Sequence, residues 1–368
     1  MASIDLKQRI LLGPGPSNVP PRVLQALSLP VVGYLDPQVV ELMDQIQELL
    51  RYLFQTENSL TFPISGTGSA GMETALCNFI EPGDPVLVCV MGFFGERLAE
   101  IASRYGAQVT RIDRPWGEAF APDEVKAALQ KTPARLVAMV QAETSTGVRQ
   151  PMEGMADSVH AQGGLLVMDC VASLGGVPIK VDEWGVDIAF SGSQKCISVP
   201  PGLAPITINQ RAQAYLSDRK TKIANWYLDL TLLRKFWGKD HIYHHTTPVS
   251  MIYAMYEGLK IIKEEGLEAR WQRHQSNAEL LWDGLEKLGL KPSVPLANRL
   301  TSITTVKIRD GYDDLAVRSA LLNNYNIEIS GGIGLYKGKV WRIGLMGHSS
   351  QRENVNLLLA ALKEVLNK

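Results

Sequence analysis

Two charged residues, Asp169 and Lys195, each close a short segment that has the composition of a buried strand. Asp169 follows the apolar run 165–168, and Lys195 follows the apolar run 188–190 after four small or polar residues. A continuous apolar run closed by a lone charge predicts a buried parallel strand that delivers this charge to the carboxyl edge of a sheet. Ligands of open α/β sheets bind at that edge, so the pair is a candidate site.

A lysine and an acid at one sheet edge are the groups that pyridoxal 5′-phosphate needs. The lysine forms a Schiff base with the cofactor aldehyde, and the acid keeps the pyridine nitrogen protonated so that the ring withdraws electrons. Either residue alone is more simply explained as an ordinary charge at the end of a strand. The hypothesis therefore depends on what the other strands deliver to the same edge.

A loop of small residues, 65–71, lies between a predicted strand at 60–64 and a predicted helix at 72–79. Backbone N–H groups and the helix dipole at such a junction favour a phosphate group. The loop also has the three glycines of a dinucleotide-binding motif, Gly66, Gly68 and Gly71. The next predicted strand, 86–90, is not followed by the acid that would bind a ribose, so a dinucleotide-dependent dehydrogenase is disfavoured.

Strands and helices alternate through the first two thirds of the chain. Further strands are predicted at 108–112, 136–140 and 165–169, and helices at 96–104, 123–130 and 155–161. This alternation predicts an α/β fold with a mostly parallel central sheet. Aromatic residues at 93–94 and the polar residues 143–146 follow two of these strands, so they should lie at the same edge as Asp169 and Lys195.

The length of 368 residues predicts more than one domain. We expect an N-terminal arm at 1–20, a large domain at 21–265 and a smaller α+β domain at 266–368. Arg342 lies inside an apolar strand of the smaller domain and needs a partner there. A substrate carboxylate and an internal salt bridge are equally good partners on this pattern alone.

Composition argues against several other classes of protein. The net charge of −1 and the single short basic run at 219–222 argue against binding to nucleic acid or an anionic membrane. No apolar run is long enough to span a membrane, and neither terminus has a targeting signal, so we expect a cytosolic protein. Adjacent His244 and His245 should point to different sides of any regular element, and no third ligand follows at a known spacing, which argues against a metal site.

Nearly the whole chain resembles the class V, fold-type I pyridoxal phosphate-dependent aminotransferases, and within them the alanine–glyoxylate and serine–pyruvate (serine–glyoxylate) group. The motifs that carry the resemblance are Gly13–Asn18, Ser65–Gly68, Glu81–Asp84, Glu143–Gly147, Val171–Gly176, Ser191–Lys195, Tyr227–Asp229, Tyr243–Thr246 and Arg342–Gly344. The resemblance implies a large domain with a mostly parallel sheet and a smaller C-terminal α+β domain.

The resemblance also implies a role for each matching residue. Lys195 would be the Schiff-base lysine and Asp169 the partner of the pyridine nitrogen. The remaining cofactor contacts would come from Thr67, Gly68, Ser69 and Gln194 at the phosphate, Thr144 near the phenolic oxygen, and Phe94 and Val171 against the ring. Tyr243 and Thr246 would reach the phosphate of a neighbouring subunit, which implies a homodimer with shared sites, and Arg342 would hold the substrate carboxylate.

The implied reaction is a ping-pong transfer of the amino group of L-alanine or L-serine to glyoxylate, with Lys195 moving the proton. Related proteins often have tryptophan in place of Phe94 and histidine in place of Ser69, and they vary near Gly33 and Tyr34, so the donor stays open. The alternatives are an aminophosphonate or hydroxykynurenine donor, lyase, desulfurase or decarboxylase chemistry with the same cofactor, and a non-catalytic partner subunit. A desulfurase is disfavoured because no cysteine stands in a matching loop.

Overall fold

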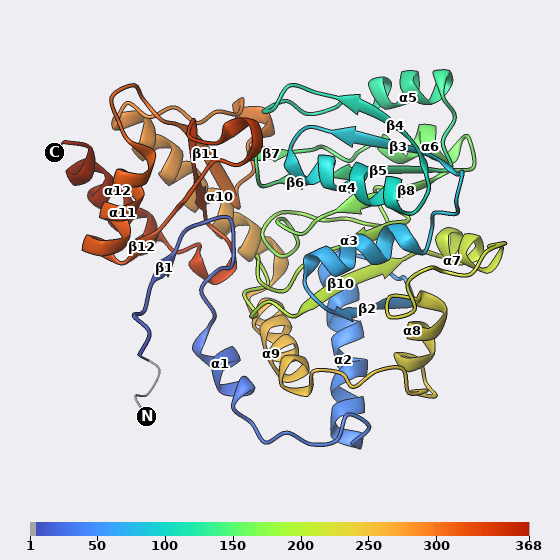
Figure 1. Ribbon diagram of the computed structural model, residues 1–368. Helices are drawn as coiled ribbons and strands as arrows, with labels where there is room; N and C mark the ends of the chain where they lie inside the picture. Colours follow the sequence, from blue (N-terminus) through green and yellow to red (C-terminus); the bar gives the residue numbers. More distant parts are fainter. Residues whose placement is uncertain (1–4, 368) are drawn as a thin grey trace.

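A seven-stranded sheet forms the centre of the protein, whose computed structural model describes residues 5–367 (Figure 1). Its strands lie in the order β2-β10-β9-β8-β5-β3-β4, and only β10 runs antiparallel to its neighbours. The strands are β2 (Leu60–Ser65), β3 (Pro85–Val90), β4 (Gln108–Asp113), β5 (Leu136–Val140), β8 (Leu165–Asp169), β9 (Ile188–Phe190) and β10 (Leu203–Ile208). This arrangement confirms the predicted α/β fold with a mostly parallel central sheet.

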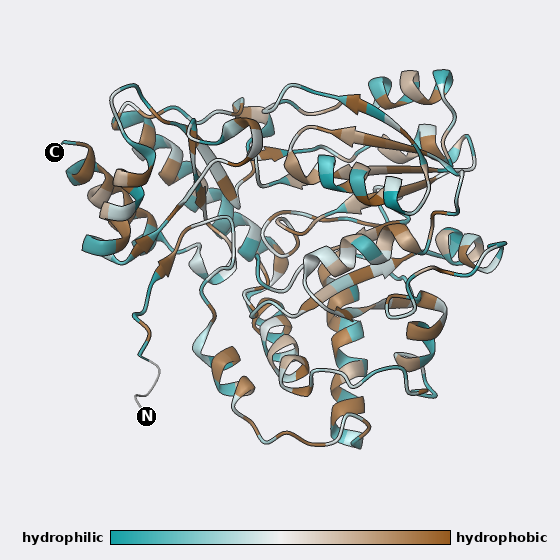
Figure 2. Cartoon of the chain, viewed as in Figure 1, coloured by the Kyte–Doolittle hydropathy of each residue, from teal (hydrophilic) through white to brown (hydrophobic). Residues whose placement is uncertain are grey.

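Helices cover the sheet and surround its edges (Figure 1). They are α1 (Pro21–Leu27), α2 (Pro37–Phe54), α3 (Gly68–Cys77), α4 (Phe93–Arg104), α5 (Pro122–Lys131), α6 (Met155–His160), α7 (Gln210–Ser217), α8 (Leu230–Phe236) and α9 (Val249–Glu265). Figure 2 shows why this layering is stable: the strands are largely hydrophobic, whereas the helices alternate between hydrophobic and hydrophilic residues. The helices bury their apolar sides against the sheet and expose their polar sides.

Two helices begin earlier than the sequence predicts. Helix α3 begins at Gly68 and α4 at Phe93, whereas residues 72 and 96 were expected. Both early starts contain glycine, which is a poor helix former, beside serine or phenylalanine, which are only moderate ones, so local preference places the start too late. In α4 a buried carboxylate from the short strand β6 (Ala142–Glu143) compensates, because Glu143 Oε2 accepts hydrogen bonds from Phe94 N at 3.0 Å and Gly95 N at 3.3 Å.

The C-terminal part of the chain packs around a second hydrophobic core. Its elements are the sheet β11 (Ile303–Lys307), β14 (Val340–Gly344) and β13 (Ser330–Gly331), and the helices α10 (Leu267–Lys287), α11 (Asp314–Tyr325) and α12 (Arg352–Leu366). Residues 327–331 form two short strands, β12 (Ile327–Glu328) and β13. Short 3₁₀ helices lie at Leu296–Asn298, Gly334–Tyr336 and Gly347–Ser349.

The N-terminal arm joins the two parts. Its strand β1 (Ile10–Leu11) pairs in parallel with β12. Elsewhere in the chain, a small hairpin of β6 (Ala142–Glu143) and β7 (Val148–Arg149) lies beside the central sheet. The first four residues of the arm and Lys368 lie outside the described residues. We propose the division into 1–20, 21–265 and 266–368 from the two cores, although the larger core continues beyond residue 265 with Leu267, Leu300 and Ile303.

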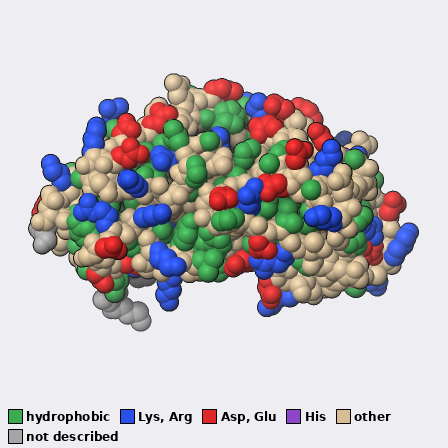
Figure 3. Space-filling model, turned by 90° about the horizontal axis from the view of Figure 1, so that it is seen from above, with side chains coloured by type: hydrophobic (Ala, Val, Ile, Leu, Met, Phe, Trp, Pro, Cys, Tyr) green, Lys and Arg blue, Asp and Glu red, His purple; other side chains and the backbone are tan. Residues whose placement is uncertain are grey.

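The exposed surface is mixed in charge. Figure 3 shows lysine and arginine side chains interspersed with aspartate and glutamate on the face seen from above. The basic run at 219–222 is in part structural, because Arg219 Nη1 donates to the carbonyl oxygens of Asn78 and Ile80 at 2.9 Å. Within residues 5–367, no helix combines the length and apolar character required to cross a membrane.

The buried carboxylate of Asp187 anchors the start of β9, and its loss should destabilise the fold. Asp187 accepts hydrogen bonds from Leu166 N at 2.7 Å and Asn209 Nδ2 at 2.8 Å, and lies 2.8 Å from the His160 ring. Asp187→Ala leaves these buried donors unpaired and should lower the free energy of unfolding by about 2–3 kcal/mol. Urea denaturation measures this effect, with Asp113→Ala at the exposed end of β4 as the control. Equal stability of the two variants would contradict this role for Asp187.

Candidate active site

A pocket opens at the carboxyl edge of the central sheet, where the sequence places the candidate residues. The predicted residues that line it are Thr67, Gly68, Ser69, Phe94, Thr144, Asp169, Val171, Gln194 and Lys195. Met72, Arg97, Ala142 and Ala172 also line it and were not predicted. The ends of β2, β3, β5, β8 and β9 and the loops that follow them bring these residues together.

The part of the pocket at the start of α3 has the donors that a phosphate group requires. Thr67 and Ser69 present hydroxyls at the start of α3, whose first-turn N–H groups lack partners within the helix. The backbones of Gly68 and Gly192 approach closely, since a Cβ added at Gly192 would lie 3.4 Å from Gly68 Cα. Gln194 also lines the pocket, and its Nε2 amide group can donate to a ligand there. This donor set fits a phosphate monoester.

Asp169 ends β8 and is almost fully buried. Its Oδ1 atom accepts a hydrogen bond from Val171 N at 2.8 Å. Burial raises the pKa of Asp169 to about 7, because the apolar surroundings disfavour the carboxylate. A cationic partner would favour the ionised form again, and a protonated pyridine nitrogen is such a partner. The environment of Asp169 therefore fits the acid that pyridoxal phosphate requires.

Lys195 lies on the loop after β9 and is held by the N-terminal arm. Its Nζ atom donates to the carbonyl of Pro14, and its own carbonyl accepts from Ser17 Oγ at 2.9 Å. A Cβ at Gly15, where φ is +108°, would lie 2.6 Å from Lys195 Cδ, so the arm needs glycine there. Burial lowers the pKa of Lys195 to about 8, and the positive charge of Arg342 acts in the same direction. The amine is therefore partly neutral near pH 7.5 and can act as a nucleophile or a base.

Arg342 adjoins the pocket but does not line it. The residue is 7% exposed, its Nε donates to Gly331 O at 2.8 Å, and its Nη1 lies 3.4 Å from Thr144 O. Burial lowers the pKa of Arg342 to about 10, so the side chain stays cationic at neutral pH. No carboxylate lies within ion-pair distance of it among the described residues, which favours a substrate carboxylate over an internal salt bridge.

Two important residues of the site were not singled out by the sequence. The Arg97 guanidinium lies 5.1 Å from the ring centres of both Phe93 and Phe94, on the first turns of α4. Glu143 is fully buried and accepts hydrogen bonds from Ser145 N and Oγ as well as from the start of α4. Because α4 was expected to begin only at residue 96, the sequence did not show that Arg97 lies within one turn of Phe93 and Phe94 on the same helix. The 143–146 segment was predicted to reach the edge, but the anchoring role of Glu143 needs the tertiary contact to be seen.

Tyr243 and Thr246 lie away from this pocket, exposed on the loop between α8 and α9. The histidines between them do not point to different sides as predicted, because this loop is not a regular element and the Nδ1 atoms of His244 and His245 are 2.9 Å apart. His245 Nε2 in turn lies 2.7 Å from Ser65 Oγ, at the end of β2. The histidine pair therefore links this loop to the strand that precedes the phosphate-type end of the pocket.

The chain belongs to the class V aminotransferase family, whose model, described as Aminotransferase class-V, matches residues 10–358. It is 44% identical over 367 residues to the alanine–glyoxylate aminotransferase of Rattus norvegicus, and the matched region covers 99% of this chain and 89% of the relative. It is 40% identical to the (S)-ureidoglycine–glyoxylate transaminase of Bacillus subtilis (strain 168), which covers 97% and 90% of the two chains.

The three-dimensional comparison leads to the same family. The crystal structure of an alanine–glyoxylate aminotransferase from Nostoc sp. superposes with a TM-score of 0.98 at 52% identity, covering 100% of this chain and 97% of the other. This likeness confirms the prediction of a fold-type I transferase. The protein is therefore a transaminase with an α/β large sheet and a pocket at its carboxyl edge.

The lowered pKa of Lys195 makes a prediction about the cofactor-free protein. The neutral amine attacks an aldehyde, so the rate at which Lys195 combines with pyridoxal phosphate should rise with pH, reach half its maximum near pH 8 and then level off. Stopped-flow absorbance of the mixed protein and cofactor measures this rate, and Lys195→Arg is the control that should give no band. A rate that still rises steeply at pH 10 would show that Lys195 titrates like an exposed lysine.

Proposed function

We propose that this protein uses pyridoxal 5′-phosphate to transfer the amino group of L-alanine, or of L-serine, to glyoxylate by a ping-pong mechanism. The observation that carries the proposal is the meeting of Lys195, Asp169 and a phosphate-type donor set in one pocket. An amine with a lowered pKa and an acid with a raised pKa at one site are typical of acid–base catalysis. The intact set also argues against a non-catalytic subunit.

Each side chain of the pocket has a defined task in this proposal. The chemistry that the cofactor would supply when bound is a ring that withdraws electrons from the substrate α-carbon as its proton leaves. The Lys195 amine would remove that proton and return it to the carbon of the cofactor aldehyde. Asp169 retains the positive charge on the ring nitrogen, and Arg342 orients the substrate carboxylate through paired hydrogen bonds.

Other residues fix the position of the cofactor. Thr67, Ser69, Gln194 and the first N–H groups of α3 would hold its phosphate, and the Thr144 hydroxyl would meet its phenolic oxygen. Phe94 and Val171 would enclose the ring from two sides. Because these groups stand on the ends of different strands, the sheet keeps the ring in one orientation relative to Lys195.

The acceptor is better supported than the donor. The names of the Rattus, Nostoc and Bacillus proteins all include glyoxylate, whereas the donor is alanine in two of them and ureidoglycine in the third. The resemblance places the departures of this chain at Phe94 against the ring and at Ser69 in the phosphate loop, and relatives also vary near the substrate at Gly33 and Tyr34. Small differences in pocket shape decide between such donors by about 1–3 kcal/mol per methylene.

A homodimer with shared sites is also part of the proposal. Tyr243 and Thr246 are exposed and lie outside the pocket of their own chain, as expected of residues that serve a partner. Exposed apolar side chains lie next to them and on the segment after α1: Ile242, beside Tyr243, is 53% exposed, and Val31, after α1, is 73% exposed. The ring of Tyr34, on that same segment, contacts the ring of Tyr243. Exposed apolar patches of this kind favour a protein interface. The cytosol remains our predicted compartment on the sequence.

The half-reaction without acceptor tests the proposed function. The cofactor-loaded protein should be yellow, lose its visible band when L-alanine or L-serine is added, and regain it with glyoxylate. Lys195→Ala should abolish this cycle, and Asp169→Ala should slow it by at least about a hundredfold because the ring nitrogen loses its counterion. Lys180→Ala, on a surface ion pair with Glu183, is the matched control.

Three outcomes would contradict the proposal. Protein that no added pyridoxal phosphate can colour would favour the non-catalytic alternative. A band that returns with other oxo acids but not with glyoxylate would refute the acceptor. Release of a product other than the donor's oxo acid would favour lyase chemistry.

A further inference from the structure

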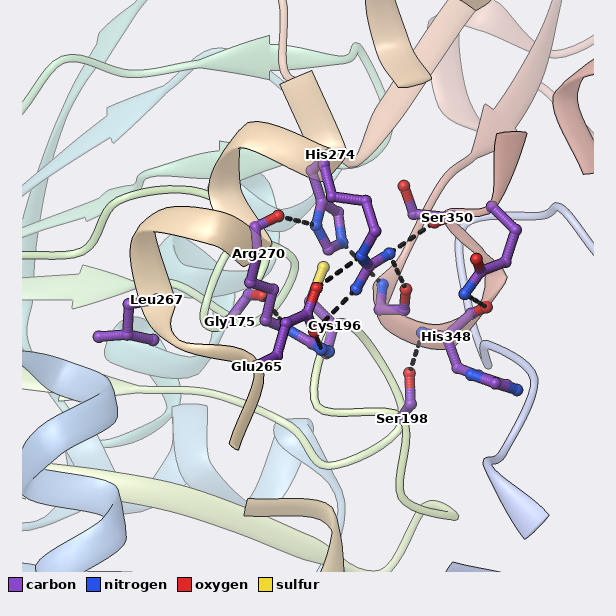
Figure 4. Close-up of polar contacts among 12 residues, drawn as sticks. Gly175, Cys196, Ser198, Glu265, Leu267, Arg270, His274, His348 and Ser350 are labelled. Carbon is purple, nitrogen blue, oxygen red and sulfur yellow. Dashed lines mark hydrogen bonds and ion pairs between the residues drawn. The ribbon is translucent and has the colours of Figure 1, made fainter. Parts of the chain in front are cut away.

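A buried arginine, Arg270, contacts Gly175 and Cys196, which belong to the two loops that follow the proposed catalytic strands (Figure 4). It stands in the first turn of α10, directly after the corner where α9 ends at Glu265. Its side chain is only 4% exposed, and each of its three donor nitrogens makes a contact. A buried charge of this kind is costly to keep, so its contacts should have a function.

Two of these contacts go to backbone carbonyls in different loops. Arg270 Nε donates to Gly175 O at 2.7 Å, and Arg270 Nη2 donates to Cys196 O at 2.7 Å. Gly175 belongs to the loop that begins directly after Asp169, and Cys196 is the residue after Lys195. We propose that Arg270 is a positioning residue that fixes the Lys195 loop against the Asp169 loop; this inference rests on the proposed function.

The two loops touch each other where Arg270 bridges them. Cys196 Sγ lies 3.3 Å from Ala172 O, and a Cβ added at Gly176 would lie 2.5 Å from Cys196 Sγ. There is no room for the loops to move closer, and Arg270 prevents them from moving apart. The carbonyl of Lys195 is held by Ser17 and the next carbonyl by Arg270, so the two successive peptide groups that follow the lysine are both held.

The third contact extends the network towards Arg342. Arg270 Nη1 pairs with Glu265 Oε2 at 2.5 Å, and Glu265 Oε1 pairs with Arg273 Nε at 2.6 Å. Arg273 Nη1 donates to Gly347 O at 3.1 Å and to Ser350 O at 2.5 Å, in the segment that follows β14. Since β14 carries Arg342, one ion network supports the segments of all three proposed reacting or substrate-binding side chains.

The shape of the guanidinium explains why arginine is needed. Its planar fork can donate to two carbonyls and a carboxylate at the same time with fixed geometry, whereas an ammonium is a single point charge. Replacing Arg270 by lysine retains the charge for Glu265 but leaves at least one buried carbonyl without its donor. The Lys195 peptide can then rotate, and a displacement of about 1 Å at the reacting group costs about a hundredfold in rate.

The test compares Arg270→Lys with wild type in the cofactor-loaded state. We expect the half-reaction rate constant with L-alanine to fall by about tenfold to a hundredfold at saturating donor, with the half-saturating concentration changed less than about threefold. The second readout is the pKa of the nitrogen that joins Lys195 to the cofactor, which a pH titration of the visible band measures. We expect this pKa to shift by about half a unit or more. Arg318→Lys, another arginine in a partly buried ion pair, on α11, is the matched control and should change neither value.

The proposal fails if Arg270→Lys has the wild-type rate constant and band midpoint and only a lower melting temperature, because the arginine would then stabilise the fold without positioning Lys195. If Arg270→Lys does not fold, Glu265→Gln is measured in its place. That variant leaves Arg270 present but unanchored, so the band midpoint should shift in the same direction, and an unchanged midpoint contradicts the proposal. A wild-type protein that binds no pyridoxal phosphate would instead overturn the proposed function itself.

Discussion

Burial of ionisable groups at the carboxyl edge of the sheet is the constraint on which the rest of this structure depends. Asp169 and Lys195 end or follow adjacent strands, where apolar surroundings raise the pKa of the acid and lower the pKa of the amine. At neutral pH, and with nothing bound, a substantial part of the acid is therefore protonated and part of the amine is neutral. A ligand that brings a cationic ring nitrogen and an aldehyde would match both groups at once, which explains why a site with so little solvent retains two such residues.

Keeping such groups in place requires buried polar contacts around them, and the structure provides these from several parts of the chain. Glu143 holds the start of α4, Ser17 of the arm holds the Lys195 carbonyl, and Arg270 holds the next carbonyl. The arm is fixed in turn by pairing of β1 with β12 near the C-terminal core. The site therefore depends on contacts between segments that are far apart in sequence, and the strands alone would not fix the loops.

The sequence predicts the strands, the sheet edge and most of the pocket residues, because apolar runs closed by polar residues report burial directly. The structure shows how much lies beyond such patterns. The direction of β10 and the early starts of α3 and α4 depend on tertiary packing, which overrides local preference. The anchoring by Glu143 and Arg270 joins segments far apart in the sequence, and the contact between His244 and His245 lies in an irregular loop; sequence spacing gives no geometry for either. Arg97 was missed because its helix was expected to begin after the aromatic pair.

The central claim is that Lys195 is the residue that binds pyridoxal phosphate. Reducing the cofactor-loaded protein with borohydride makes that bond permanent, and mass spectrometry of the digested protein then locates it. The account predicts a cofactor-modified peptide at Lys195, with modification at the other lysines no greater than in Lys195→Arg treated in the same way. A cofactor bond at another lysine, or protein that stays unmodified although it forms the yellow band, would contradict the account.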